Sequence, residues 1–214
     1  MSPDAATSTL PRIAVPLAGA GMLAFVVLAI AIHLLRPDLH WWDAQMSRYL
    51  LSPHGGWLQA AYCALAVAIV AIALSLRLLA APRARSGGAF VLFGAGALSL
   101  VVTALAPMDG DASAPSFIGW VHGVSAQAAF LCVAVAMLLQ STWMRHDPHW
   151  RSRMPLALTL AALAFAGLWV LVLVDGLPSG VSQKVVIAQI ALWFGVTWWW
   201  LQADLRAARA GPRR

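Results

Sequence analysis

The chain has 214 residues, of which 61% are hydrophobic and 10% are charged, and its mean hydropathy is +0.78. A soluble domain is about a quarter charged, so this composition excludes a soluble domain and indicates an integral membrane protein. The net charge of +6 does not indicate a nucleic-acid partner, because the basic residues lie in short connections between apolar segments, where they set membrane orientation.

Six apolar segments along the chain are each close to the length of about 20 residues that a helix needs to cross a bilayer. The first is longer than the apolar core of a signal peptide, about 7–15 residues, and is therefore interpreted as an uncleaved span. Residues 1–12 are expected to be a disordered tail, and residues 204–214 a basic tail. Between them we predict one all-α domain, a bundle of six transmembrane helices over residues 13–203, with spans at 13–35, 57–81, 88–107, 117–140, 155–177 and 183–203.

The distribution of lysine and arginine predicts the orientation of this bundle. The side that holds both termini carries eleven of these residues: Arg12, Arg77, Arg83, Arg85, Arg145, Arg151, Arg153, Arg206, Arg209, Arg213 and Arg214. The opposite side carries only Arg36, Arg48 and Lys184. The positive-inside rule then places both termini in the cytoplasm, as expected for a multi-pass protein of a bacterial inner membrane.

The first connection on the other side, residues 36–56, predicts a short amphipathic helix lying in the membrane interface. Its expected apolar face consists of Trp42, Met46, Tyr49 and Leu50, and its expected water-exposed face consists of His40, Asp43 and Ser47. Side chains along one helix face point outward in parallel, so this strip does not predict a convergent catalytic set. Ser47 alone remains a candidate, if the helix folds over the bundle.

The stretch 107–127 carries the most informative polar residues. His122 lies about one and a half turns inside the fourth span, and an ionisable side chain at that depth indicates a functional site. Ser125 shares its helix face, and Asp109 and Asp111 precede the span in a short loop. Gly119 and Gly123 form a small-xxx-small pair, which predicts close approach of a neighbouring helix.

Three motifs resemble a known family of six-span bacterial and archaeal membrane proteins, domain of unknown function 998. They are Pro107-Met108-Asp109 followed by His122-Gly123; Ser47 after the first span; and Gly180-Val181-Ser182-Gln183-Lys184 leading to Trp193. The family usually has Phe-Pro-Thr-Asp where this chain has Ala106-Pro107-Met108-Asp109, and Gln-Arg where it has Gln183-Lys184. The resemblance, over roughly residues 13–203, implies a six-helix architecture and no established activity.

The polar residues fit two functions best. In the first, the chain is a structural module or binds a lipid or small amphiphile at a polar cluster formed by Asp109, Asp111, His122, Ser125, Asp175 and Lys184. In the second, it is an outer-leaflet enzyme, hydrolase-like, in which Asp109 and His122 are an acid–base pair, Ser47 a nucleophile and Lys184 an electrostatic stabiliser. A transporter is less favoured, because the middles of the spans are apolar and continuous.

Both functions predict that Asp109, His122 and Lys184 converge at one end of the bundle, with Asp175 or Ser47 at the edge of the cluster. No histidine or cysteine pair has the spacing of a metal site such as HxxxH, and Cys63 and Cys132 lie within spans. We therefore predict neither a metal nor a cofactor. The expected partners are membrane lipids, and the sequence leaves the oligomeric state and the choice between enzyme and binding module open.

Overall fold

The computed structural model describes residues 9–51, 53–111 and 113–210. Within these ranges, six helices are long and apolar enough to cross a membrane, which confirms the predicted all-α six-span bundle. They are α2 (Thr9–Leu35), α3 (Gly55–Leu79), α4 (Gly87–Leu105), α5 (Phe117–Trp143), α6 (Met154–Leu173) and α7 (Ser179–Ala210). Four short 3-10 helices lie in the connections: η1 (Met46–Leu50), η2 (Pro82–Ala84), η3 (Met144–His146) and η4 (Arg151–Arg153).

The helix starts follow from local chemistry. Ser86 caps α4 by accepting a hydrogen bond from the Ala89 amide at 3.1 Å, and Ser116 caps α5 by accepting one from the Gly119 amide at 2.9 Å. Pro155 lies in the first turn of α6, where its missing N–H costs nothing.

Three helices are longer than the spans predicted for them, since α5 continues to Trp143 and both terminal helices extend further. α2 begins at Thr9, inside the expected N-terminal tail, and α7 continues to Ala210, through most of the expected basic tail. The remaining parts of both expected tails, residues 1–8 and 211–214, lie outside the described residues.

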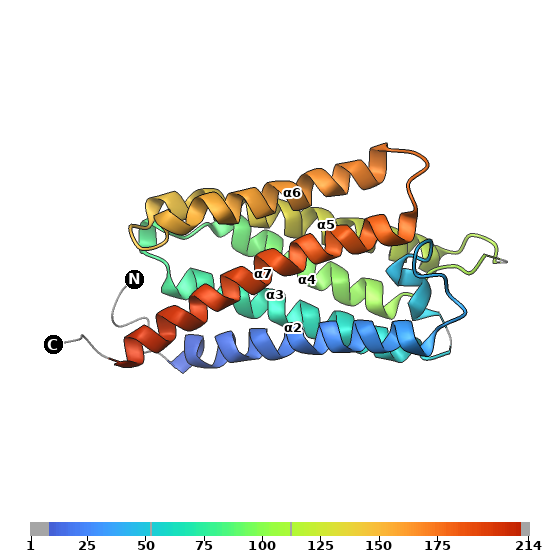
Figure 1. Cartoon of the computed structure of the whole chain (residues 1–214), viewed down its shortest axis with the longest axis horizontal. Coiled ribbons are helices and arrows are strands. Elements are labelled where there is room, and N and C mark those ends of the chain that lie inside the picture. Colours follow the sequence, from blue (N-terminus) through green and yellow to red (C-terminus); the bar gives the residue numbers. More distant parts are fainter. Residues whose placement is uncertain (1–8, 52, 112, 211–214) are drawn as a thin grey trace.

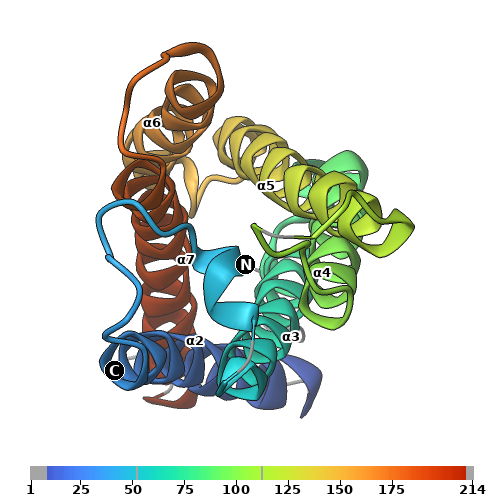
Figure 2. The same cartoon turned by 90° about the vertical axis from the view of Figure 1, so that its right-hand side faces the viewer.

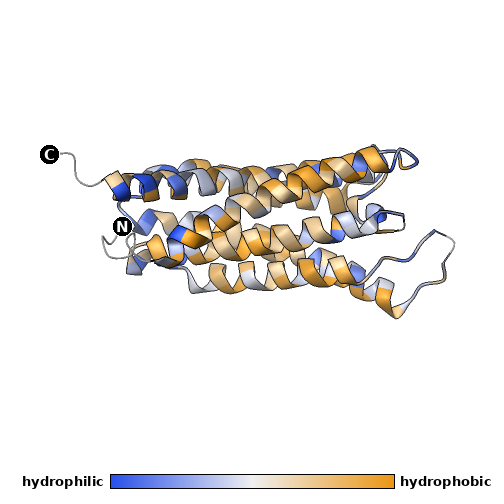
Figure 3. Ribbon diagram, turned by 90° about the horizontal axis from the view of Figure 1, so that it is seen from below, coloured by the Kyte–Doolittle hydropathy of each residue, from blue (hydrophilic) through white to orange (hydrophobic). Residues whose placement is uncertain are grey.

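The six helices form a ring in which each packs against the next and α2 closes the ring against α7 (Figures 1 and 2). We call the end with connections 36–54, 106–116 and 174–178 the site end. The opposite end, with connections 80–86 and 144–153, is the arginine end, where α2 begins and α7 ends (Figure 1). Figure 3 shows hydrophilic residues gathered at both ends and apolar residues between them, as a membrane span requires.

The helices differ in how much they bury. In α3 56% of the most apolar window is buried, against 17% in α6, so α3 is central and α6 peripheral. One apolar core, toward the arginine end, surrounds Phe93, Met137 and Trp193. A second, toward the site end, surrounds Ile32 and Tyr49.

The connection 36–54 differs from the predicted interfacial helix. It forms a turn followed by the 3-10 helix η1, which lies within the outline of the ring in the end view of Figure 2. Met46, Tyr49 and Leu50 are buried as expected, but Trp42 is 47% exposed and Ser47 is only 8% exposed. The assignment of Ser47 to a water-exposed strip with His40 and Asp43 was therefore wrong, because η1 packs into the bundle instead of lying on its edge.

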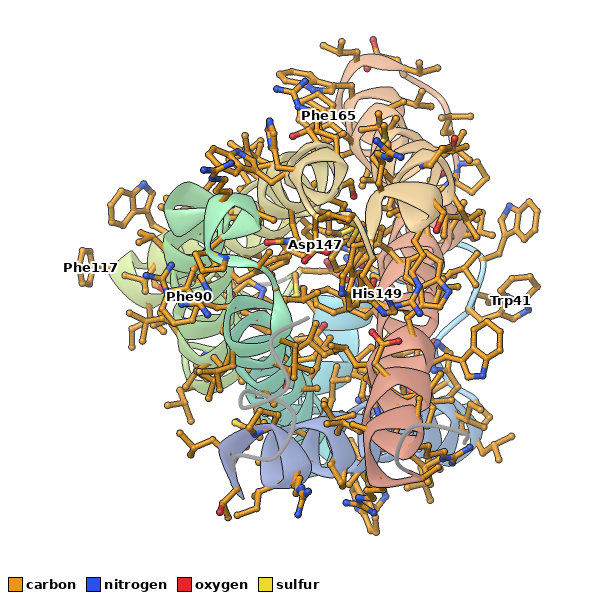
Figure 4. The ribbon with its side chains drawn as sticks, turned by 90° about the vertical axis from the view of Figure 1, so that its left-hand side faces the viewer. Trp41, Phe90, Phe117, Asp147, His149 and Phe165 are labelled. Atoms are coloured by element: carbon orange, nitrogen blue, oxygen red, sulfur yellow. The ribbon has the colours of Figure 1, made fainter. Side chains whose placement is uncertain are left out.

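The arginine end is fastened by a buried carboxylate of α7. Asp204, 4% exposed, accepts two hydrogen bonds from Arg153 at 2.7 and 2.9 Å, and the His149 Nε2 atom lies 3.0 Å from it. Asp147, also buried, accepts hydrogen bonds from the amides of Ala81 and His149. Figure 4 looks along the bundle from this end, with Asp147 and His149 toward the middle of the view and with Phe165, and Trp41 and Phe117 of the site end, at its edges. The hydrogen bonds and ion pairs of Asp147 and Asp204 tie two connections and α7 together.

Candidate functional site

The connection between α4 and α5 positions the first acidic residue of the site. The Asp109 carboxylate accepts hydrogen bonds from the Ser116 amide at 3.0 Å and from the Ser116 hydroxyl at 2.6 Å. These bonds lower the pKa of Asp109, the side-chain bond contributing most. The carboxylate therefore lies at the N-terminus of α5, where the helix dipole also favours negative charge.

Gly119 makes this position possible. A Cβ atom at Gly119 would lie 2.0 Å from Asp109 Oδ2, whereas a Cβ at Gly123 would meet no atom within 4 Å. The structure therefore does not show the expected close approach of a neighbouring helix at this glycine pair. The carboxylate of the preceding connection occupies the space over Gly119, and the space beside Gly123 is open.

His122 lies one turn beyond Gly119 and is 5% exposed. Its Nδ1 atom is 2.7 Å from the carbonyl oxygen of Ala106, at the end of α4. A carbonyl only accepts, so Nδ1 carries the proton, and in the neutral ring Nε2 is an acceptor. Nε2 is buried and has no hydrogen-bond partner among the residues that the structure describes. His122 thus presents an unused basic nitrogen.

Ser125 belongs to a packing contact between α4 and α5. Its hydroxyl lies 2.9 Å from that of Thr103 and 3.0 Å from the carbonyl oxygen of His122, while the Thr103 hydroxyl lies 2.8 Å from the Ser99 carbonyl oxygen. With one proton each, the two hydroxyls can make two of these three bonds at a time. Ser125 supports the backbone beneath His122 and does not line the site cavity defined below.

Ser47, Asp109 and His122 line one cavity of about 650 Å³, the site cavity, together with Gln45, Met108, Gly119, Gly123, Ala126, Gln127, Phe130, Leu131, Leu168, Trp169, Leu171, Val172 and Gln183. Its polar groups come from η1 and Gln45 before it, the α4–α5 connection, the ends of α5 and α7 nearest the site end, and Gln127 further along α5. Its apolar walls come from α5 and α6, including Phe130, Leu168 and Trp169. A smaller apolar cavity inside the ring shares Ser47, Phe130 and Gln183 with it.

Lys184 does not join Asp109 and His122. Its ammonium group donates hydrogen bonds to the carbonyl oxygens of Trp41 and Ala44, both at 2.7 Å, and lies 5.6 Å from the centre of the Tyr49 ring. The neighbouring Gln183 accepts a hydrogen bond from the Met46 amide at 2.8 Å. The expected three-residue cluster is therefore incomplete, because the backbone of the connection 36–54 satisfies the lysine.

Two other acidic candidates lie apart from the cavity. Asp111 is exposed and pairs with Arg48 of η1, which lowers the pKa of Asp111. Asp175 is exposed in the α6–α7 connection, and its side chain forms no hydrogen bond or salt bridge with another described residue. Across the described residues, no three His, Cys, Asp or Glu side chains gather as metal ligands would.

Sequence reasoning missed several residues of the cavity lining. Gln45 lies in a connection whose path only the tertiary fold determines, and Trp169, which is 46% exposed, lines the cavity from within an apolar span. Gln183 was noted only as a motif residue beside Lys184, and it is the glutamine that reaches the cavity.

The residues of this site can be compared with those of known protein families. A family model described as "Protein of unknown function (DUF998)" matches residues 19–200, most of the chain. No curated protein and no solved structure matches the chain significantly. The match spans all six helices and every residue of the site cavity, so the chain belongs to the DUF998 family.

Proposed function

We propose that the protein binds a lipid-like amphiphile in the site cavity. The observation that carries the proposal is the division of this cavity: Gln45, Ser47, Asp109, His122 and Gln183 come from its site end, and the walls that α5 and α6 add are apolar except for Gln127. Ligand sites commonly combine a mostly apolar lining with a few polar groups that fix orientation. A molecule with a polar headgroup and an acyl or alkyl chain has the matching division.

The position of the cavity supports a ligand that arrives from the bilayer. One of its walls belongs to α6, the least buried helix of the ring, and Trp169 and Val172 of that helix are 46% and 65% exposed. In a membrane such exposed apolar side chains face lipid. An alkyl chain could then lie between α5 and α6 with its headgroup toward η1.

Photo-crosslinking tests this proposal. The purified chain in phosphatidylcholine nanodiscs is irradiated with a long-chain alcohol that carries a diazirine on its chain, and labelled peptides are identified by mass spectrometry. Labels are expected on α5 and α6 near the site end, and an excess of the unmodified alcohol is expected to compete. Labels spread evenly over all lipid-facing helices would contradict a specific site.

A cavity-filling variant sharpens the same experiment. Gly123→Leu places a side chain where a Cβ meets no atom within 4 Å, in the lining of the site cavity, and is expected to abolish competable labelling. Gly94→Leu is the matched control, because Gly94 is also helical, has equally open space and faces a different groove. Equal labelling of both variants would contradict binding in the site cavity.

An outer-leaflet hydrolase is the second candidate function. The observation that favours it is the tautomer of His122, since the contact of Nδ1 with the Ala106 carbonyl leaves Nε2 as the basic nitrogen of a side chain that lines the same cavity as Ser47. No hydrogen bond joins Ser47 to His122 among the described residues, so the serine would have to move toward the base. Asp109 bonds to Ser116 and would act through charge alone.

Hydrolysis of long-chain esters by the reconstituted protein tests this second candidate. Under it, His122→Gln is expected to abolish turnover while leaving the thermal stability close to that of the wild type. Turnover that survives this substitution would exclude His122 as the base. If His122 only supports packing, His122→Leu is expected to be tolerated or stabilising, because apolar side chains can replace buried polar groups.

A further inference from the structure

We propose that the site cavity selects a headgroup that donates hydrogen bonds and carries no negative charge, such as a hydroxyl or an amine. The inference rests on the proposed binding of an amphiphile and specifies its chemical class. It follows from the charge of the lining, from the free acceptor on His122 and from the occupied N-terminus of α5.

The first step is the sign of the charge. Asp109 is the only Asp, Glu, Lys or Arg among the lining residues, and its lowered pKa keeps it ionised at neutral pH. Lys184 and Arg48, two cations of the same end, do not line the cavity: Lys184 donates to two backbone carbonyls, and Arg48 pairs with Asp111. A phosphate, sulfate or carboxylate headgroup would therefore meet a like charge with no lysine or arginine in the lining to balance it, which is unfavourable.

The second step is the acceptor on His122. Because Nδ1 is held by the Ala106 carbonyl, the neutral ring can only accept at Nε2. That atom has no partner among the described residues, and a buried polar atom without a partner is costly. His122 lines the cavity but its Nε2 atom is covered, so a headgroup that donates a hydrogen bond would satisfy it once the neighbouring side chains shift, whereas an anionic headgroup would bring only acceptors.

The third step concerns the N-terminus of α5. A helix N-terminus is a ready site for an anionic ligand group, and here it lies at the cavity. Ser116 and Asp109 already fill it: the Ser116 hydroxyl accepts from the Gly119 amide, and Asp109 lies over Gly119. The Asp109 carboxylate thus occupies the helix N-terminus, a position that would otherwise favour an anionic headgroup.

Gln183 and Ser47 are compatible with this selection. The Gln183 side-chain oxygen accepts from the Met46 amide, so its NH₂ group remains available as a donor. The Ser47 hydroxyl can donate or accept. Both can bond a hydroxyl oxygen, so an alcohol headgroup would find acceptors and donors together, and an ammonium would gain the charge of Asp109.

Competition between single-chain compounds of equal length tests the inference. The diazirine alcohol labels the chain in phosphatidylcholine nanodiscs, and hexadecanol, hexadecylamine and hexadecyl sulfate compete at equal mole fractions in the bilayer. The alcohol and the amine are expected to displace the probe at concentrations at least about tenfold lower than the sulfate, a difference of about 1.4 kcal/mol. Equal or stronger competition by the sulfate would overturn the inference and leave amphiphile binding standing. Absence of competable labelling at the site cavity would overturn both.

Two Asp→Asn variants assign the selection to Asp109. Asp109→Asn removes the only acidic charge of the lining and keeps a side chain that can accept from Ser116, so the difference between sulfate and alcohol is expected to shrink. Asp111→Asn is the matched control, because it removes an exposed charge two residues away that pairs with Arg48 outside the cavity. A difference that shrinks equally in both variants would show a general surface charge effect and contradict the role of Asp109.

Discussion

Gly119 and Asp109 form the tightest steric relationship in the site, and it is local in origin. The carboxylate can bond the Ser116 amide and hydroxyl only because the residue at 119 has no side chain. Asp109 thereby reaches the first turn of α5 and contributes the charge of the cavity. A methyl group at position 119 would displace the Asp109 carboxylate from the N-terminus of α5.

Gly119→Ala is accordingly expected to lower the thermal midpoint of unfolding in detergent by a few degrees. The new Cβ would lie 2.0 Å from Asp109 Oδ2 and displace the carboxylate from Ser116. Gly123→Ala, four residues on in the same helix, has open space and gains the helix propensity of alanine, up to about 1 kcal/mol. It is expected to be neutral or stabilising. If the two variants unfold at the same temperature, Asp109 does not depend on Gly119.

The Asp109 carboxylate also predicts a pH dependence. Its folded pKa lies below the ordinary value of 3.8, so the ionised form stabilises the fold. This contribution is complete above the unfolded pKa and is lost as the pH falls through the folded pKa. The difference in thermal midpoint between the wild type and Asp109→Asn is therefore expected to shrink between about pH 6 and about pH 3. A difference that stays constant over this window would contradict the assigned bonds.

At the scale of elements, Trp193 joins three helices. Its indole nitrogen, on α7, donates to the Ser141 hydroxyl of α5 and to the Ala157 carbonyl of α6, both at 3.1 Å, and the side chain is fully buried. One donor thus fixes the peripheral helix α6 to two neighbours. The walls of the site cavity come from this same pair, α5 and α6, so their spacing affects the cavity as well.

Trp193→Phe is expected to destabilise the protein by about 1 kcal/mol, because it removes the indole N–H donor while keeping most of the side-chain volume. Trp199→Phe is the matched control, since Trp199 lies on the same helix and is 63% exposed. Unfolding in a mild detergent measures both. An equal effect of the two substitutions would show that the indole hydrogen bonds contribute nothing measurable.

The elements differ in how far the sequence predicts them. Hydropathy determines the six spans, because a helix is the only way for a single segment to satisfy its backbone in lipid. The 3-10 helix η1 is different, since its depth depends on contacts with distant residues, such as the Met46 amide with Gln183 and the Trp41 and Ala44 carbonyls with Lys184. Such pairings leave no periodic signal in the chain.

The candidate site is likewise predicted by the sequence only in part. The inward direction of His122 follows from its depth in α5. Asp109 and Ser47 are expected at a similar depth at the site end, and the structure places all three residues in the lining of one cavity. The partners of each side chain do not follow, because nearer groups compete for them. Ser116, close in the sequence, binds Asp109, and the Ala106 carbonyl binds His122. Backbone carbonyls bind Lys184, so pairing of opposite charges was the wrong rule here.

At the scale of the whole molecule, the two ends of the ring have different chemistry. Among the described residues, the site end carries the cavity and three lysine and arginine residues, and the arginine end carries nine. The even number of spans places the start of α2 and the end of α7 at the same end (Figure 1). Membrane orientation therefore decides which leaflet would supply the proposed ligand.

The positive-inside rule predicts that the arginine end faces the cytoplasm and that the site cavity opens toward the outer leaflet. Single cysteines in a background without Cys63 and Cys132 test this in intact cells with a membrane-impermeant maleimide. Ser113→Cys, exposed in the α4–α5 connection, is expected to react from outside. Arg83→Cys, exposed in the α3–α4 connection, is expected to react only after the membrane is opened. Because Arg83→Cys removes one of eleven charges, Ser152→Cys, exposed at the same end, serves as a variant with the charges intact. Labelling of Ser152→Cys but not Ser113→Cys from outside would reverse the orientation, and the cavity would then draw its ligand from the inner leaflet.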